Sequence, residues 1–102
     1  MRLNLYKVFG NSMVPTLACG DFVISWKLAS CRYKVGDIIV VRHCRLGHIV
    51  KRIQSIDENS SVRLIGDSPL STSPDNLGWQ DHRSILGRVI WRVSAERYSP
   101  IL

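Results

Sequence analysis

Short apolar runs alternate with turn-forming residues along the whole chain, and no apolar pattern of helical period persists for three turns. The run at residues 38–41 is continuously aliphatic, which favours a strand buried on both faces. Short strands separated by Gly, Asp, Asn and Ser predict an all-β fold of coiled β-sheets or a barrel. The predicted strands cover residues 3–5 with 7–9, 22–26, 38–42, 48–53, 62–65 and 85–93.

Length and composition predict a single domain over residues 1–102. A chain of 102 residues with 45% hydrophobic content is long enough to bury one modest core. No internal repeat and no linker interrupts the strand pattern. The longest polar stretch is the Pro- and Ser-rich loop over residues 66–78.

The formal net charge is +6, from 14 Lys and Arg residues against 8 Asp and Glu residues. This balance favours acidic partners without identifying one. The basic residues are scattered, and the longest basic run is the pair Lys51-Arg52. We therefore expect no nucleic-acid partner, because nucleic-acid binders usually carry a basic stripe or tail.

Cysteine usage and hydropathy bear on localisation. Cys19, Cys31 and Cys44 are an odd number without a CxxC pair, which favours reduced thiols in the cytoplasm. No apolar run approaches the roughly 20 residues of a membrane-spanning helix. The N-terminus lacks the continuous apolar region of a signal peptide. We expect a cytoplasmic protein without an integral membrane anchor; the sequence does not show the oligomeric state.

One hydroxyl, that of Ser12, stands between asparagine and methionine in the stretch GNSMVPTL at residues 10–17. An ordinary surface turn uses Asn, Gly, Ser and Pro in this way. A nucleophile also needs a rigid, glycine-flanked position, and it needs a base. Histidine and lysine residues are both available for that role. Both interpretations of Ser12 stay open on this stretch alone.

Lys51 is the lysine that is set among aliphatic residues. In an extended strand Ile49, Lys51 and Ile53 share one face, because side chains alternate between the two faces. An ammonium on an apolar face loses solvation, which lowers its pKa from about 10.4 toward the range of a general base. A single strand lysine in a basic protein is more often solvated, so the pattern alone allows either role.

Three blocks of the chain add a family resemblance. In order they are GNSMVPTLACGDFVI, then YKVGDIIVVR followed by HIVKRI, then LIGDSPLSTSPDNLGWQDHRSILGRV, and the resemblance spans residues 8 to 92. They resemble the nucleophile box, the lysine-bearing strand pair and the last loop of the signal peptidase I family. The peptidase domains of the self-cleaving SOS repressors are related to it, and these proteins use a Ser-Lys dyad. The resemblance implies a serine endopeptidase with coiled, barrel-like β-sheets.

The resemblance also implies roles for four residues. Ser12 would be the nucleophile, and Lys51, as a neutral amine, would be its general base. The Ser12 backbone N–H would hold the oxyanion, and Gly10 stands where some relatives carry an additional hydroxyl donor. Met13 would line a shallow pocket for a small residue ahead of the cut.

Two further residues would support the lysine. Ser73 and Asp75 resemble the Ser-x-Asp of the family's last loop, where the serine hydroxyl orients the base. The loop departs from the family pattern, because Ser68 replaces the usual Asn and Leu77 stands where an arginine usually pairs with the aspartate. A solvated turn is the alternative interpretation of Ser73 and Asp75.

Other polar residues have simpler interpretations. The three aspartates that follow glycine are predicted to cap turns; they are Asp21, Asp37 and Asp67. The pattern HCxxxH, which begins at His43 and ends at His48, offers soft metal ligands, but three ligands in one tight turn rarely build a full site. We expect no metal and no cofactor.

The resemblance leaves three functions to weigh. The expected partner is a protein precursor with an extended N-terminal leader, and the small proteases that mature nickel-type superoxide dismutase resemble this chain most. The second possibility is a leader peptidase, for exported or pilin substrates, that a partner recruits to the membrane. The third is a catalytically inactive basic binding module of the same fold. Covalent labelling of Ser12 would separate the peptidases from the binding module.

Overall fold

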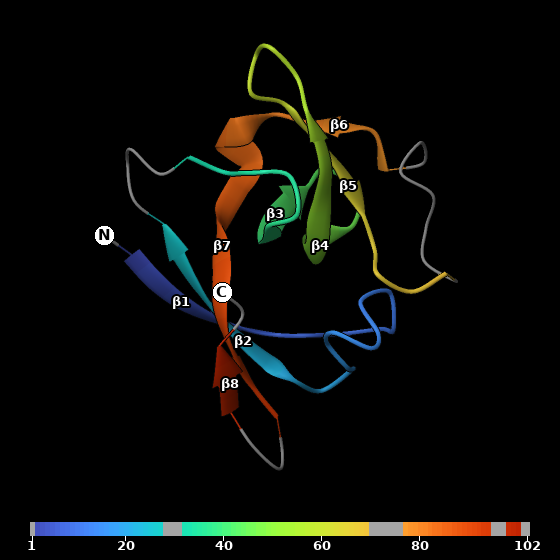
Figure 1. The fold of residues 1–102 in the computed structure, drawn as a ribbon, viewed down its shortest axis with the longest axis vertical. Helices are drawn as coiled ribbons and strands as arrows, with labels where there is room; N and C mark the ends of the chain where they lie inside the picture. The colour runs from blue at the N-terminus through green and yellow to red at the C-terminus, as the bar shows by residue number, and fades with distance from the viewer. Residues whose placement is uncertain (1, 28–31, 70–76, 95–97, 101–102) are drawn as a thin grey trace.

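A computed structural model describes residues 2–27, 32–69, 77–94 and 98–100. Within these residues the fold is all-β, as the turn-punctuated pattern predicts, and it contains a single short 3-10 helix. The strands form one curled antiparallel sheet in the order β1-β2-β7-β3-β4-β5-β6, and β8 pairs with β7 (Figure 1). The elements are β1 (Arg2–Lys7), β2 (Phe22–Lys27), β3 (Ile38–His43), β4 (Gly47–Ile56), β5 (Val62–Ile65), β6 (Trp79–Gln80), η1 (His82–Ser84), β7 (Ile85–Val93) and β8 (Tyr98–Pro100).

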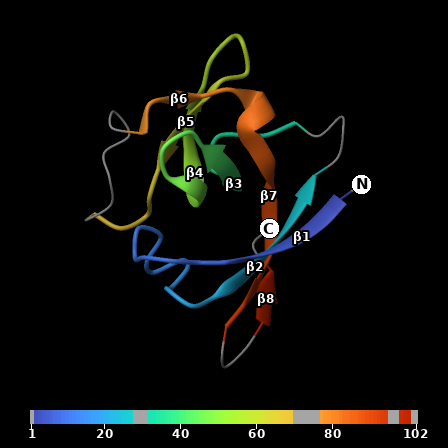
Figure 2. The same ribbon diagram turned by 180° about the vertical axis from the view of Figure 1, so that it is seen from behind.

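Strand β7 joins the two halves of the sheet, because it pairs with β2 on one side and with β3 on the other. Irregular register between Ile24 and Ser25, and again between Val40 and Val41, accompanies these pairings. Bulges of this kind bend and twist a sheet, which fits its curled shape. In Figures 1 and 2 the turn that follows β1 lies against the segment that follows β5. The curl therefore brings distant parts of the chain together.

The core is divided between the two faces of strand β3. Ile38 and Val40 belong to one cluster, which also contains Val8, Met13, Leu17, Val23 and Val89. Ile39 and Val41 belong to a second cluster, which also contains Ile53, Val62, Leu64, Leu77 and Ile85. Because both faces of β3 are covered, its sequence is continuously aliphatic instead of alternating.

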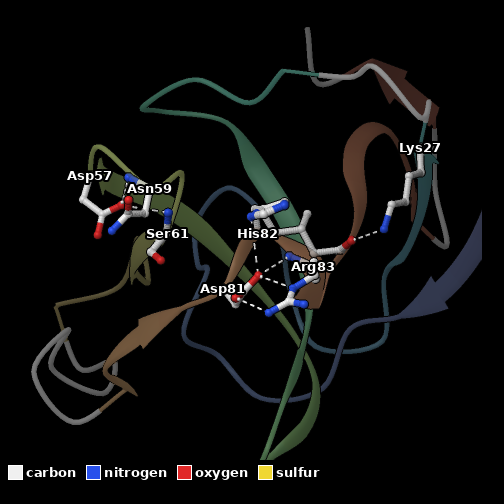
Figure 3. Close-up of polar contacts among 8 residues, drawn as sticks. Lys27, Asp57, Asn59, Ser61, Asp81, His82 and Arg83 are labelled. Atoms are coloured by element: carbon white, nitrogen blue, oxygen red, sulfur yellow. Dashed lines mark hydrogen bonds and ion pairs between the residues drawn. The ribbon is translucent and has the colours of Figure 1, made fainter.

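The predicted strands are present with shifted ends. The first strand ends at Lys7 and not at Phe9, and β4 runs longer than predicted, over Gly47–Ile56. Strands β6 and β8 were not predicted, because runs of two and three residues carry too little periodicity to recognise. Local contacts fix several turns (Figure 3): Asp57 accepts from the backbone N–H groups of Asn59 and Ser61, and Asp81 caps η1 by accepting from the Arg83 N–H.

A candidate active site between two segments

The turn that carries Ser12 is closed at its base by backbone hydrogen bonds between Val8 and the Gly20-Asp21 pair, with N···O distances of 2.7 and 2.8 Å. Gly10 has a φ of +79°, a conformation that glycine adopts without steric cost. Leu17 then donates its N–H to the Met13 carbonyl at 2.9 Å. The chain from residue 10 to residue 20 is therefore an ordered loop held to the end of β1.

Two contacts fix Ser12 itself. The Ser68 N–H donates to the Ser12 carbonyl at 2.8 Å, which ties the turn to the segment that follows β5. The next side chain, that of Met13, is buried in the first core cluster with Leu17. Since the carbonyl and the following residue are both held, the position of Ser12 is set by the core and not by solvent-exposed chain.

Lys51 lies on β4 opposite Ile39 of β3. Its side chain is 6% exposed, and its neighbours on the same face are Ile49 and the buried Ile53, so the predicted shared face is confirmed. Burial lowers the pKa of the Lys51 ammonium below its ordinary value. No carboxylate pairs with Lys51 among the described residues. Burial therefore makes the charged form of Lys51 less favourable than it is for a solvated lysine.

Ser12 and Lys51 line the same pocket, a small space of about 80 Å³. One wall comes from the chain that leaves β1, and the other comes from β4. Met13 also lines the pocket, as its predicted role requires, whereas Gly10 is not part of the lining. The complete lining is Lys7, Val8, Phe9, Ser12, Met13, His48, Ile49, Val50 and Lys51. Ser12 and the buried Lys51 thus border one small space.

The other face of β4 carries an ion-pair network at Arg52. The guanidinium donates two hydrogen bonds to the Asp67 carboxylate, at 2.8 and 2.7 Å, and a third to the Gly36 carbonyl at 2.7 Å. Thr16 donates its hydroxyl to the same carboxylate. The network therefore joins the Ser12 turn, the Lys51 strand and the segment after β5.

This network corrects one prediction. Asp21 and Asp37 do cap turns, by accepting from the Ala18 and Lys34 N–H groups, whereas within the described residues the Asp67 carboxylate accepts from the side chains of Arg52 and Thr16. The hydrogen bonds from Arg52, followed by that from Thr16, lower the pKa of the Asp67 carboxyl, and Asp67 in turn raises the pKa of Arg52. The sequence Gly-Asp does not indicate whether the carboxylate accepts from a nearby backbone N–H or from a guanidinium far along the chain.

Ser73 and Asp75 lie outside the described residues, so their predicted support of Lys51 stays a prediction. His43 is buried, and both of its ring nitrogens are occupied: Nδ1 accepts from the Arg45 and Leu46 N–H groups, and Nε2 lies 3.1 Å from the Leu77 carbonyl oxygen. Its role in the described chain is to tie the β3–β4 hairpin to the segment before β6. In the described residues no three His, Cys, Asp or Glu side chains gather as metal ligands.

One pocket contact was not anticipated from the sequence. The His48 ring meets the Tyr6 ring edge to face, with centroids 5.6 Å apart, at the pocket wall where β4 approaches β1. These two strands are not neighbours in the sheet order, so no strand pattern signals the contact. The pair therefore links the pocket residue His48 to strand β1.

The family assignment agrees with this geometry. The sequence profile of the Peptidase S24-like family matches residues 2–90. The chain belongs to the Peptidase S24-like family. Membership supports a serine-peptidase-like function in general terms and fits the all-β fold. No curated protein matches the chain. In the described part of this S24-like chain, no helix has the length and apolar character needed to cross a membrane.

Proposed function

We propose that this S24-like protein is a serine endopeptidase in which Ser12 is the nucleophile and Lys51 is the general base. The observation that carries the proposal is the shared pocket, where the Ser12 turn meets a lysine that is buried and has a lowered pKa. A neutral amine accepts a proton from a hydroxyl, whereas an ammonium does not. The resemblance of the three sequence blocks supplies the same two residues.

The proposed reaction has two stages. Ser12 Oγ attacks the peptide carbonyl carbon while its proton passes to the Lys51 amine. The carbon–nitrogen bond then breaks, the leaving amine takes that proton, and an ester to Ser12 remains. In the second stage Lys51 takes a proton from water, the resulting hydroxide attacks the ester, and Ser12 Oγ recovers the proton. The backbone N–H of Ser12 is the proposed donor to the oxyanion.

The proposed substrate is a protein precursor whose N-terminal leader lies extended in the pocket. The small pocket volume supports a small residue, such as Ala, Gly or Ser, immediately before the cut. The finer assignment, maturation of a nickel-type superoxide dismutase, rests on the sequence resemblance alone. The competing substrates are exported or pilin precursors presented at a membrane.

The test is to incubate the purified chain with a leader-bearing superoxide dismutase precursor and to determine the new N-terminus by mass spectrometry. We expect one cut, lost in Ser12→Ala and kept in the control Ser61→Ala, whose serine lies in the turn before β5. Cutting that survives Ser12→Ala would overturn the nucleophile assignment. If only an exported precursor is cut, and only with membranes present, the peptidase stands and the substrate assignment is wrong.

A further inference from the structure

Basic side chains line both walls of the pocket that contains Ser12. Lys7 comes from the end of β1, and His48 and Lys51 come from β4. No acidic residue of the described chain is part of the lining. The net charge of the chain favours acidic partners in general, and in this pocket such a partner would meet basic groups without a competing carboxylate.

The three basic residues lie at different depths. Lys7 and His48 are exposed, whereas Lys51 is 6% exposed. Lys7 and His48, called here the pocket mouth, therefore meet solvent, and Lys51 lies on the pocket floor. In the part of the chain that the structure describes, neither mouth residue forms an ion pair with a carboxylate. Both are available to a ligand that enters from solvent.

Aromatic contacts restrain both residues of the pocket mouth. The Lys7 ammonium lies 5.8 Å from the centre of the Phe9 ring and 5.9 Å from that of Phe22, within the range at which a ring attracts a cation. The His48 ring packs edge to face on Tyr6, the residue before Lys7, with ring centres 5.6 Å apart. The end of β1 therefore positions both basic groups beside the pocket.

We propose that the pocket mouth selects leaders that carry an aspartate or glutamate within about three residues of the cut, a span of about 10 Å in an extended chain. The carboxylate would accept hydrogen bonds from the Lys7 ammonium and from a ring N–H of His48. The scissile peptide itself would meet Ser12. This inference rests on the proposed peptidase function, because it names the kind of leader that the same site accepts.

The acidic side chain belongs at the mouth and not on the floor of the pocket. A carboxylate beside Lys51 would favour the ammonium and so remove the neutral amine that the proposed reaction needs. At the mouth the carboxylate stays partly in water, where one ion pair changes an equilibrium constant by about two- to fivefold. We therefore expect a preference among leaders and not an absolute requirement for an acidic residue.

The test compares peptides that have alanine before the cut and differ at one nearby position, which is Glu, Ala or Lys. Mass spectrometry measures kcat/KM for cleavage by the full chain. Fluorescence anisotropy measures the affinity of the Ser12→Ala variant for the same peptides, so binding is tested apart from cleavage. At one position or more we expect the Glu peptide to exceed the Lys peptide by at least about fourfold in both measurements.

Charge reversal at the pocket mouth gives the sharper result. Lys7→Glu should prefer the Lys peptide over the Glu peptide, and misfolding does not produce a reversed preference. Lys34→Glu makes the same change in net charge outside the pocket lining and should keep the preference for Glu. His48→Phe keeps a ring for the contact with Tyr6 but removes the N–H donor, so the preference for Glu should fall by about two- to fivefold.

The outcomes separate this inference from the peptidase function. Equal cleavage of the Glu, Ala and Lys peptides would overturn the acidic preference and leave the peptidase assignment standing. If no peptide is cut, the binding measurement decides: a preference for Glu that Lys7→Glu reverses supports the role of the mouth, and equal affinities overturn it. A preference that changes as much in Lys34→Glu as in Lys7→Glu would arise from net charge and would also overturn it.

Discussion

The two faces of strand β4 shift the pKa values of two neighbouring cations in opposite directions. Lys51 points to the apolar side, where burial lowers the pKa of its ammonium. Arg52 points to the other side, where two hydrogen bonds to Asp67 raise the pKa of its guanidinium. The two residues differ by one position in sequence, yet among the described residues Lys51 has no carboxylate partner, whereas Arg52 has a bidentate one.

If Lys51 is the proposed general base, one strand separates a reactive group from a structural one. A desolvated, unpaired amine loses its proton readily and is available for proton transfer. A guanidinium stays charged at all working pH values and fits a carboxylate with two parallel bonds. Alternation along the strand places the two chemistries on opposite sides. The Asp67 carboxylate therefore ties the Ser12 turn to β4 from the face that carries Arg52.

Replacing Lys51 by arginine should have the largest effect, because both faces of β4 would then carry a guanidinium that stays charged. Arginine does not deprotonate in proteins and so would not accept the Ser12 proton. We expect the cleavage rate to fall at least about 100-fold, with the same loss in Lys51→Ala. The measurement is the rate at which each variant cleaves the precursor, and Lys34→Arg is the control. Near wild-type turnover in Lys51→Arg would rule out the general-base role.

Removing the Asp67 carboxylate, on the other face, should mainly lower the stability of the fold. Asp67→Ala leaves Arg52 partly buried without its partner and removes the bond from Thr16. We expect the free energy of unfolding in urea to fall by about 1–3 kcal/mol. Cleavage should fall as well, because the network joins the Ser12 turn to β4. A variant with wild-type stability would show that the pair does not hold these segments.

The pH dependence of the two faces should also differ. The folded pKa of Lys51 is lowered, so the unfolded chain binds more protons between that value and about 10.4, and stability rises with pH across this window. Cleavage should rise with pH through an inflection below the ordinary lysine value. Lys51→Met should flatten the stability curve in the alkaline range. Parallel curves for wild type and Lys51→Met would contradict desolvation of Lys51.

The exposed Asp81–Arg83 pair should have the smallest effect and serves as the reference for Asp67 (Figure 3). Hydrogen bonds from Arg83 lower the pKa of the Asp81 carboxyl to about 2. The pair is local in sequence and open to solvent, where ion pairs contribute little. Asp81→Ala, which also removes the cap of η1, should lower the urea midpoint by less than Asp67→Ala does. A loss of stability as large as that of Asp67→Ala would contradict the expectation that an exposed pair, local in sequence, contributes less than the part-buried Arg52–Asp67 pair.

Local pattern was sufficient for much of the fold. The strands and their turns follow from alternation and from turn residues, and the shared face of Ile49, Lys51 and Ile53 follows from the two-residue period of a strand. The candidate site residues Ser12 and Lys51 came from a motif, its spacing and a family resemblance. The pairing of Asp67 with Arg52 could not be predicted, because a carboxylate after glycine caps turns in most contexts and Arg52 lies 15 residues away.

By itself the sequence determined where the six longer strands lie and which side chains share a face, since both depend on a few adjacent residues. Tertiary structure alone decided that β7 lies between β2 and β3, that Ser12 and Lys51 line one pocket, and that Arg52 meets Asp67. It also left Leu3 and Leu5 of β1 exposed. These outcomes depend on how the sheet curls, and curl is a property of all the strands packed together.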